Sequence, residues 1–382
     1  MSLWICRAAS WLLVVGTAMA IATGSISPAW SQGAGTDIII GQSGALSGPM
    51  DEIGKEMKAG AEAYINVVNQ AGGISGRKIR LVSLDDGGEP DRAKANTQKL
   101  IADDNALALI AYSGEHTIKA ALPLVEKAKI PFIAAASGDQ TLREPFNRYI
   151  FNTRASYFEE TEGGIDQYVR RGINKIALFY QNDPYGRAGL AGVEKAMRDR
   201  KLSILIFGSV DRNSTNVASA AQSINKSGAQ AVVIAAGART AVAFIREMKK
   251  LGSTAQYFVL SSTGAKTLAS QLGDEGRGVA VSQVVPLPSS EGELLGRDYV
   301  KHIGGVNNTS FASLEGYIGA RVLVEGLRKA GKSPTRETLV DALERLGMID
   351  LTGFKVKFAP GNHNGSSLVE LTVIGAQGLY RR

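Results

Sequence analysis

Apolar and polar residues alternate along the chain in blocks that predict repeated strand and helix units. A short apolar run at 37–41 precedes a segment at 54–70 with apolar residues at helical spacing: Met57, Ala61, Tyr64, Ile65 and Val68. That spacing is typical of an amphipathic helix packed on a sheet. A strand at 78–84, a helix at 91–102 and a strand at 106–112 continue the pattern. The unbroken apolar runs of the strands indicate a mostly parallel sheet with helices on both faces.

A second series of the same kind begins after Arg154. Helical segments separate its predicted strands, which lie at 175–180, 203–207, 231–235 and 257–260. Two such series in succession indicate an α/β protein built from two doubly wound, Rossmann-like lobes. We expect a crossover between the lobes near Pro286 and Pro288, because two prolines so close together do not fit inside a helix or a central strand.

An apolar segment near the N-terminus predicts a signal peptide. Arg7 precedes an acid-free apolar run at 8–22, which is shorter than the roughly 20 residues that a membrane span needs. Cleavage after Ala20 or after Ser31 would leave small residues at the recognition positions. The second site leaves the shorter tail before the first strand, so we place the signal peptide at 1–31 and expect the mature chain in the periplasm.

Composition excludes several classes of function. The single cysteine, Cys6, precedes the apolar run, so the mature chain is expected to have no disulfide, no thiol chemistry and no cysteine-bound metal. The formal net charge is +7, but the basic residues are dispersed and no run of five or six occurs. We therefore expect a solvated basic surface and no nucleic-acid partner.

The motifs of common enzymes and cofactor sites are missing from the sequence. The loop at 41–49 is rich in glycine and follows a strand, but it lacks the Gly-Lys-Ser/Thr ending of a P-loop and the spacing of a dinucleotide site. His116, His302 and His363 are too widely separated to suggest a metal site, and no Gly-x-Ser-x-Gly elbow occurs. We expect a tight turn at 41–49, no cofactor, no metal and no enzymatic activity.

Several segments resemble the leucine/isoleucine/valine-binding family of type I periplasmic binding proteins: Ser47-Gly48-Pro49, the Ala-Gly-Gly-Ile-Ser-Gly-Arg-Lys stretch within 69–79, Asp85-Asp86, Asn-Asp-Pro-Tyr-Gly at 182–186, and 353–378. The resemblance implies two lobes on a three-strand hinge that close over a small molecule. It also implies that the closed form binds the permease subunits of an ABC importer in the inner membrane. The corresponding lobes are 36–154 plus 285–352, N-terminal, and 155–284 plus 353–382, C-terminal.

The resemblance also implies where a ligand would bind. In amino-acid binders of this family, two N-lobe loops, here 112–117 and 135–139, receive the α-carboxylate through backbone groups and hydroxyls. The C-lobe adds an aromatic residue matching Tyr185, a loop at 237–239, and an acid for the α-ammonium that would fall at Ser262 or Thr263. The predicted ligand-binding residues are Ser113, Gly114, Glu115, Ala136, Ser137, Gly138, Tyr185, Ala238, Arg239 and Thr263.

Two departures from the family pattern bear on the ligand. Position 115 carries Glu where a hydroxyl is expected, and no acid lies near Thr263. An ionised Glu115 would repel a ligand carboxylate in a desolvated cleft. One hypothesis is that Glu115 receives a cationic or hydrogen-donating group, while Arg239 or Arg154 takes an anionic one. The alternative is that Glu115 points to solvent or caps the helix that follows it.

Three aromatic or acidic residues have alternative interpretations. Tyr185 stands at a predicted helix start, where it could stack on a ligand or pack between the lobes. Glu315 and Tyr317 could edge the cleft, although a helical tyrosine more often belongs to the core. We expect a monomeric transport protein for an amino acid or related compound, with a periplasmic ligand sensor as the alternative. An enzyme on a Rossmann-like scaffold is the third and least favoured hypothesis.

Overall fold

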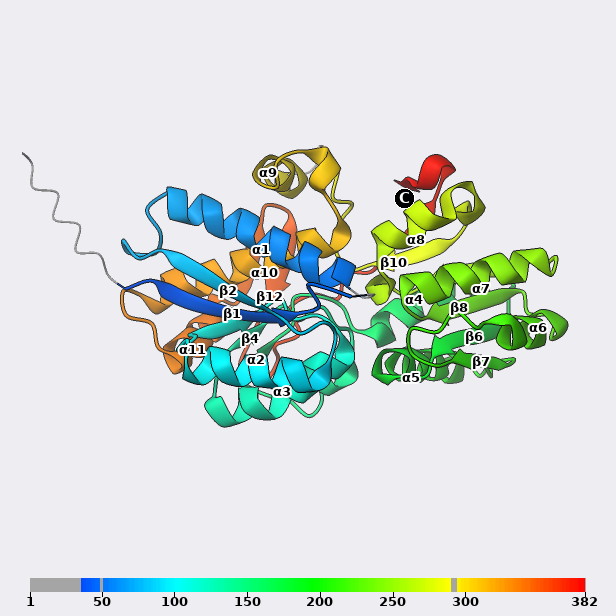
Figure 1. Cartoon of the computed structure of the whole chain (residues 1–382), viewed down its shortest axis with the longest axis horizontal. Helices are drawn as coiled ribbons and strands as arrows, with labels where there is room; N and C mark the ends of the chain where they lie inside the picture. Colours follow the sequence, from blue (N-terminus) through cyan, green and yellow to red (C-terminus); the bar gives the residue numbers. More distant parts are fainter. Residues whose placement is uncertain (1–35, 49–50, 290–293, 382) are drawn as a thin grey trace, which may run out of the picture. The chain divides into compact units, whose positions relative to one another are not determined.

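The computed structural model describes residues 36–48, 51–289 and 294–381. The signal peptide predicted at 1–31 lies outside these ranges. Within them the chain forms two separate β-sheets, each with its own helices (Figure 1), and a short hairpin. No helix in the described ranges is both long and apolar enough to cross a bilayer.

The first sheet is wholly parallel and has the order β2-β1-β3-β4-β5. Its strands are β1 (Ile38–Gly44), β2 (Ile79–Asp85), β3 (Ala108–Ile110), β4 (Phe132–Ile133) and β5 (Ile150–Phe151). One face packs on α1 (Asp51–Gln70), α9 (Leu294–His302), α10 (Phe311–Ala330) and α11 (Arg336–Leu346). The other packs on α2 (Pro90–Ala102) and α3 (Glu115–Ala128). We call this sheet with its helices the first lobe.

The second lobe is built on a sheet of order β14-β13-β10-β9-β8-β6-β7. Five of its strands are parallel: β6 (Ile176–Gln181), β7 (Phe207–Val210), β8 (Ala231–Ala235), β9 (Gln256–Val259) and β10 (Ala280–Gln283). Helices α4 (Tyr157–Arg170) and α5 (Pro184–Asp199) cover one face. The other face carries α6 (Ala218–Lys226), α7 (Ala238–Lys250) and α8 (Ala265–Leu272). Helices on both faces of each sheet confirm the predicted doubly wound α/β fold.

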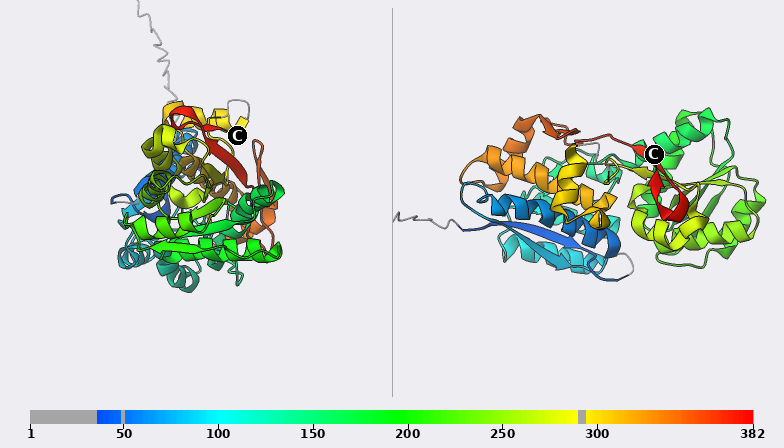
Figure 2. Two further views of the ribbon diagram at one scale, coloured as in Figure 1. Left: turned by 90° about the vertical axis from the view of Figure 1, so that its right-hand side faces the viewer. Right: turned by 90° about the horizontal axis from the view of Figure 1, so that it is seen from above.

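The C-terminal strands add antiparallel pairs to the second sheet. Strand β13 (Glu370–Ile374) pairs with β10, and β14 (Tyr380–Arg381) pairs with β13. Figure 2 shows these red strands on the second lobe. The chain thus passes between the lobes after β5, after β10 and again before β13.

The third passage lies later than the predicted boundary at 353. Strands β11 (Met348–Leu351) and β12 (Phe354–Lys357) form an antiparallel hairpin. Phe354 and Val356 alternate with lysines along β12, and both apolar side chains are buried in the core of the first lobe. Alternate residues of β12 thus form one apolar face, and that face packs in the first lobe. The chain joins the second sheet only at β13.

Helices α1 and α10 approach each other at two glycines. A Cβ atom on Gly60 would lie 1.7 Å from the carbonyl oxygen of Ser313, and one on Gly316 would lie 2.1 Å from that of Met57. No side chain fits at either position, because the obstacle in each case is backbone. The contact fixes the mutual position of the two first-lobe helices that also supply acidic residues to the site described below.

We expect Gly60→Ala to destabilise the protein by about 3 kcal/mol, because the added methyl group forces the helices apart. The control is Gly163→Ala in α4, where the nearest atom, Val369 Cγ1, would lie at an ordinary 3.5 Å. That change should be neutral or stabilise by up to about 1 kcal/mol through helix propensity. Urea unfolding measures both, and equal midpoints for Gly60→Ala and the wild type would contradict the close approach.

Candidate ligand-binding site

A small polar cavity lies where the carboxyl ends of strands from both sheets meet. Its volume is about 30 Å³, room for about two water molecules. The first lobe lines it with residues that follow β1, β2, β3 and β4: Ala45, Gly88, Ser113, Gly114, Glu115, His116 and Ala136. The second lobe lines it with residues at the ends of β6, β7 and β9: Gln181, Asp183, Tyr185, Arg212 and Ser262. Open α/β sheets bind their ligands at this edge.

Two alanines in the left-handed region precede the cavity loops of the first lobe. Ala111, after β3, has φ 57° and Ala134, after β4, has φ 54°. This conformation costs a residue with a Cβ roughly 1–2 kcal/mol. Both alanines are buried, and a bridge between Ser113 and Ala136 joins the two loops just beyond them. Packing therefore maintains a strained backbone directly before the loops that line the cavity, as is typical of binding sites.

Glu115 and Tyr157 link the two lobes across the cavity. Glu115 is the first residue of α3, after Gly114 in the left-handed region, and Tyr157 is the first residue of α4. The Tyr157 hydroxyl donates to Glu115 Oε1 and lies 2.8 Å from Ser262 Oγ. Glu115 is only 5% exposed, so the interpretation that it points to solvent is wrong, whereas its place at a helix start is confirmed.

The pKa of Glu115 is raised from its ordinary 4.5 to about 7, chiefly by burial and to a smaller extent by the negative charges of Asp139 and Asp183. The hydrogen bond from Tyr157 acts in the opposite direction and stabilises the ionised carboxylate. Ionising this carboxyl group in the cavity thus costs free energy. A nearby cation would offset that cost, because it stabilises the carboxylate.

Several polar atoms around the cavity have no hydrogen-bond partner within the described residues. Ser113 Oγ and Gln181 Oε1 are buried and unpartnered, as are His116 Nδ1 and Arg212 Nε. One nitrogen of each of the last two residues meets the Gly88 carbonyl oxygen, which lies 2.8 Å from His116 Nε2 and 2.7 Å from Arg212 Nη2. A buried polar atom without a partner costs about 1–3 kcal/mol, so a bound molecule with complementary groups would stabilise this arrangement.

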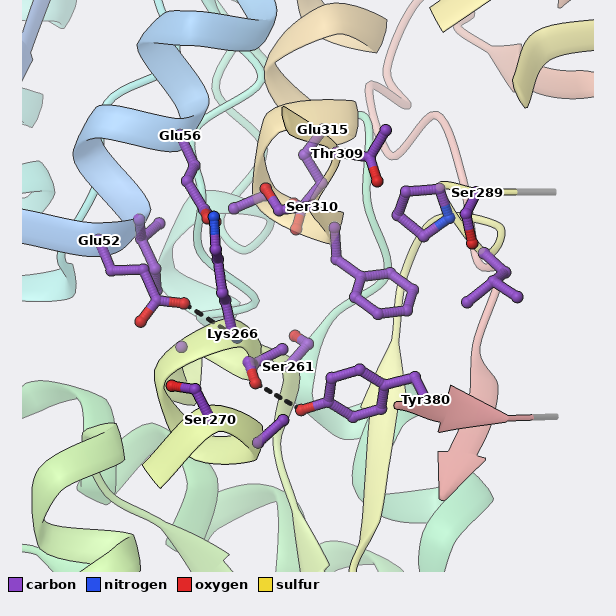
Figure 3. A pocket seen from close by; sticks show the side chains of 18 of the residues that line it. Glu52, Glu56, Ser261, Lys266, Ser270, Ser289, Thr309, Ser310, Glu315 and Tyr380 are labelled. Carbon is purple, nitrogen blue, oxygen red and sulfur yellow. Dashed lines mark hydrogen bonds between the residues drawn. The ribbon is translucent and has the colours of Figure 1, made fainter. Parts of the chain in front are cut away.

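A larger cavity of about 340 Å³ adjoins the small one and shares Ile53 and Ser262 with it. Its size falls in the range of small-molecule sites. Apolar side chains line part of it, including Leu287, Phe311 and Tyr380. Its charged residues are Arg154 and four that Figure 3 labels: Glu52, Glu56, Lys266 and Glu315. The two cavities together form the candidate site.

Arg154 lies at the centre of a buried charge cluster that spans the lobes. Its Nη1 lies 3.1 Å from Glu315 Oε2 of α10, and its Nη2 lies 2.9 Å from Glu160 Oε1 of α4. Arg154 also donates to the Ser261 hydroxyl. Burial raises the pKa of Glu315, and the positive charge of Arg154 opposes that rise. Both Nη groups are therefore already engaged by protein acceptors, which limits what Arg154 can offer a ligand.

Glu52 and Glu56, one turn apart on α1, face α8 of the other lobe. The Glu52 carboxylate accepts hydrogen bonds from the backbone N–H groups of Lys266, at 3.0 Å, and Thr267, at 3.1 Å. It caps the helix N-terminus, where negative charge is favoured. Burial and the neighbouring Glu52 raise the pKa of Glu56 to about 7. The Lys266 side chain extends toward Glu56 (Figure 3).

Half of the predicted ligand-binding residues line the small cavity: Ser113, Gly114, Glu115, Ala136 and Tyr185. The Tyr185 hydroxyl lies 3.1 Å from Thr263 Oγ1, and its ring centre is 5.6 Å from that of Tyr157. Thr263 thus sits behind Tyr185 and orients it. Tyr185 both packs between neighbours and borders the cavity, which combines the two interpretations of the sequence.

The other predicted residues lie around the cavities without lining them. Ser137 is buried and accepts a hydrogen bond from the Asp139 N–H group at 3.1 Å, and Ala238 is buried at the start of α7. Gly138 lets α4 approach, because a Cβ there would lie 2.7 Å from the Tyr157 nitrogen. Arg239 is exposed to solvent and does not border either cavity. Of the two arginines considered for an anionic group, only Arg154 lines the site.

Sequence reasoning missed several residues that line the site, among them Gln181, Arg212, Glu52 and Glu56, and also Tyr157, which links the lobes. Gln181 is the last residue of β6 and Arg212 lies two residues after β7, positions that could have identified them. The prediction that Glu315 edges the cleft is confirmed. Tyr317 is buried in the core of the first lobe, where its hydroxyl lies 2.8 Å from His302 Nδ1.

Comparison with known proteins places the chain in a family. The sequence profile of the family described as "Periplasmic binding protein" matches residues 37–378. The chain belongs to the periplasmic binding protein family. Two solved structures of this kind are similar along nearly their whole length. A possible leucine/isoleucine/valine-binding protein from Rhodopirellula baltica is 30% identical, with a TM-score of 0.85 over 91% of this chain and 97% of that one.

A substrate-binding periplasmic protein from Ralstonia solanacearum is 32% identical, with a TM-score of 0.84 over 90% of this chain and 99% of that one. An amino acid binding protein from Pseudomonas aeruginosa is 27% identical over 236 residues, which span 60% of this periplasmic binding protein and 62% of that relative. More distant structures share the fold, including one from Thermus thermophilus with bound valine, at 21% identity, and one from R. palustris with benzoate, at 19%.

The raised pKa of Glu115 predicts how stability depends on pH. Because its pKa rises from 4.5 to about 7 on folding, the protonated carboxyl favours the folded state, and that contribution is lost as pH rises through about 7. Glu115→Gln keeps an acceptor for Tyr157 without the charge. We expect this variant to exceed the wild type by about 2 kcal/mol at pH 8 and to match it near pH 4.5. Thermal unfolding from pH 4.5 to 8 measures the difference, and parallel curves would contradict it.

The buried cluster around Arg154 predicts that the stability of the protein depends strongly on the positive charge of this side chain. Arg154→Met leaves Glu160 and Glu315 buried without a counter-charge, which should destabilise the protein by about 3–5 kcal/mol at pH 8. The loss should shrink near pH 5, where Glu315, whose pKa burial raises, can take up a proton. Arg148→Met is the control, because Arg148 pairs with surface acids and such pairs contribute about 1 kcal/mol or less. Equal losses in the two variants would refute the buried role of Arg154.

Proposed function

We propose that this protein is the solute-binding subunit of an ABC importer of the branched-chain amino acid type. It would bind a small polar ligand, an amino acid or a related compound, between the lobes and deliver it to the permease subunits in the inner membrane. The observation that carries the proposal is the set of buried, unpartnered polar atoms from both lobes around one cavity. In this proposal the chain is exported through a signal peptide at 1–31 and acts in the periplasm as a monomer.

The geometry supports a mechanism in which the ligand stabilises one arrangement of the lobes. Both lobes supply polar groups to the cavity, so a ligand that satisfies them gains more free energy when the lobes are together. The contacts of Glu115 with Tyr157, Arg154 with Glu315, and Glu52 with α8 are made only in that arrangement. The ligand would thereby increase the fraction of molecules in that arrangement. A permease that binds surfaces of both lobes would then bind the ligand-loaded protein preferentially.

The side chains around the cavity favour binding over catalysis. Of the three histidines, His116 alone lines the site, and its Nε2 is engaged by the Gly88 carbonyl oxygen. His302 contacts Tyr317, and His363 contacts the carbonyl oxygen of Ile150, both within the first lobe. A serine nucleophile activated by a neighbouring imidazole is therefore not assembled at the described cavities. Known members of the family are likewise substrate-binding proteins.

A ligand screen tests the proposal on refolded protein, from which any co-purified ligand has been removed. The compounds are added in turn, and thermal unfolding is measured with each of them. The panel covers amino acids, amines, carboxylic acids, amides and sugars. A true ligand at 100 times its Kd should stabilise the protein by about 2.7 kcal/mol. No stabilisation by any class at millimolar concentration would refute a role in solute capture.

The hydrogen bond between the lobes gives a second test. Tyr157→Phe removes the hydroxyl that joins Glu115 to the second lobe, so the affinity for the ligand found in the screen should fall about fivefold to tenfold. Tyr257→Phe is the control, because Tyr257 is a buried tyrosine of the same lobe that does not border the described cavities. Titration calorimetry measures both affinities. Equal affinities would show that closure does not depend on this contact.

A further inference from the structure

The side chains around the two cavities carry more acid than base. Together they are lined by five carboxyl groups, those of Glu52, Glu56, Glu115, Asp183 and Glu315. The basic residues among the lining are Arg154, Lys266 and Arg212. Arg154 is paired with Glu160 and Glu315, while Arg212 donates to the Gly88 carbonyl oxygen and lies 3.9 Å from Glu89. Carboxyl groups therefore outnumber basic side chains around the two cavities.

The unpartnered atoms of the small cavity point to the same chemistry. Gln181 Oε1 is an amide oxygen and can only accept a hydrogen bond, and the amide nitrogen, which donates to Asp183 Oδ2 at 2.6 Å, fixes the orientation of the group. Ser113 Oγ, 3% exposed as a residue, can also accept. Glu115 offers a further acceptor beside them. The atoms that await a partner in this cavity are mainly acceptors, so the matching group of a ligand is a donor of several N–H bonds.

We propose that the site selects a small organic cation with a protonated amino group, whose N–H groups are received by Glu115, Gln181 and Ser113. This inference rests on the proposed function and specifies its ligand. An ammonium group fits the small cavity, since it is compact and supplies three donors. The remainder of the ligand lies in the larger cavity, over Ile53 and Phe311.

A carboxylate on the ligand finds only two basic groups on the lining of the larger cavity, Lys266 and the Nε of Arg154. The Nη groups of Arg154 are engaged by Glu160, Glu315 and Ser261, and the Arg239 side chain lies outside the site. Glu56 and Glu315 would repel an anion in the larger cavity. Lys266 extends toward Glu56 (Figure 3), and its positive charge favours the ionised form of that carboxyl group. An amine without a carboxylate therefore fits better than the amino acid from which it derives.

The inference is tested with matched sets of compounds that share a side chain and differ in which charged groups they carry. One set is phenylalanine, 2-phenylethylamine and 3-phenylpropanoate, and a second is leucine, 3-methylbutylamine and 4-methylpentanoate. Lysine and 1,5-diaminopentane form a third pair, and neutral amides and sugars complete the panel. Affinities are measured by calorimetry on refolded wild-type protein. We expect amines to give the tightest binding, about tenfold or more above the matched amino acid and acid.

Each outcome of the panel separates the two proposals. Tightest binding by an amine supports the inference. Tightest binding by an amino acid, a carboxylate or a neutral compound overturns the inference and leaves solute capture in place. If none of the classes binds at millimolar concentration, the proposed function itself falls, and the inference falls with it.

Glu115→Gln tests the group that is proposed to hold the ammonium. The variant should lose about tenfold or more in amine affinity, because a charged hydrogen bond becomes a neutral one. Glu126→Gln is the matched control, since Glu126 lies on the same helix but is exposed. It should bind as the wild type does. Unchanged amine affinity in Glu115→Gln would overturn the assignment.

Proton release adds a readout that a merely structural role would not change. Glu115 faces Tyr157, Asp139, Asp183 and Tyr185, and it shares the cavity with His116 and Arg212. An ammonium group stabilises the ionised carboxylate against this surrounding charge, so amine binding near pH 7 should release protons, and affinity should rise from pH 6 to pH 8. Calorimetry in phosphate and in Tris counts the protons.

Glu56→Gln distinguishes Glu115 from Glu56, whose pKa burial likewise raises to about 7. If Glu115 is the group that ionises on binding, proton release persists in Glu56→Gln and is lost in Glu115→Gln. Proton release that persists in Glu115→Gln, or proton uptake by the wild type, would overturn the proposed pairing of Glu115 with the ammonium group.

Discussion

The buried guanidinium group of Arg154 is the constraint on which the arrangement of the lobes depends. A charge in the interior must be paired, because the cost of removing it from water is several kcal/mol even after relaxation. Arg154 finds its partners on helices of different lobes, Glu160 on α4 and Glu315 on α10. Neither lobe alone supplies both carboxylates. The pairing of this single side chain therefore couples the position of one lobe to the other at the wall of the larger cavity.

The architecture could be predicted because it is encoded locally. Helical periodicity and unbroken apolar strands are visible within a dozen residues, and both sheets follow from them. Two local errors have local causes. The strand predicted at 203–207 lies at Phe207–Val210, because an edge strand buries only alternate residues and its apolar signal is weak. The hairpin strand β12 was assigned to the second lobe, because its alternation shows that one face is buried but not against which core.

The candidate site could be predicted only in part, for a different reason. Ser113 and Ala136 follow strands of the first lobe, and chain order together with the family resemblance suffices to find them. Tyr157 reaches Glu115 only because Gly138 allows α4 to approach, a steric fact that sequence periodicity does not contain. The position of Arg239 shows the converse. The resemblance indicates which loop position Arg239 occupies, but it does not determine the direction of the side chain, which is toward solvent.

The C-terminal strand has a consequence for handling the protein. The Tyr380 hydroxyl donates to the carbonyl oxygen of Ala265 at 2.6 Å, and its ring meets Phe311 at 5.5 Å between centres. Both neighbours line the larger cavity together with Tyr380, so strand β14 forms part of its wall. Any change that displaces β14 from the second sheet would therefore also remove one side of the cavity. Variants that differ in this strand are therefore different reagents for any study of ligand affinity.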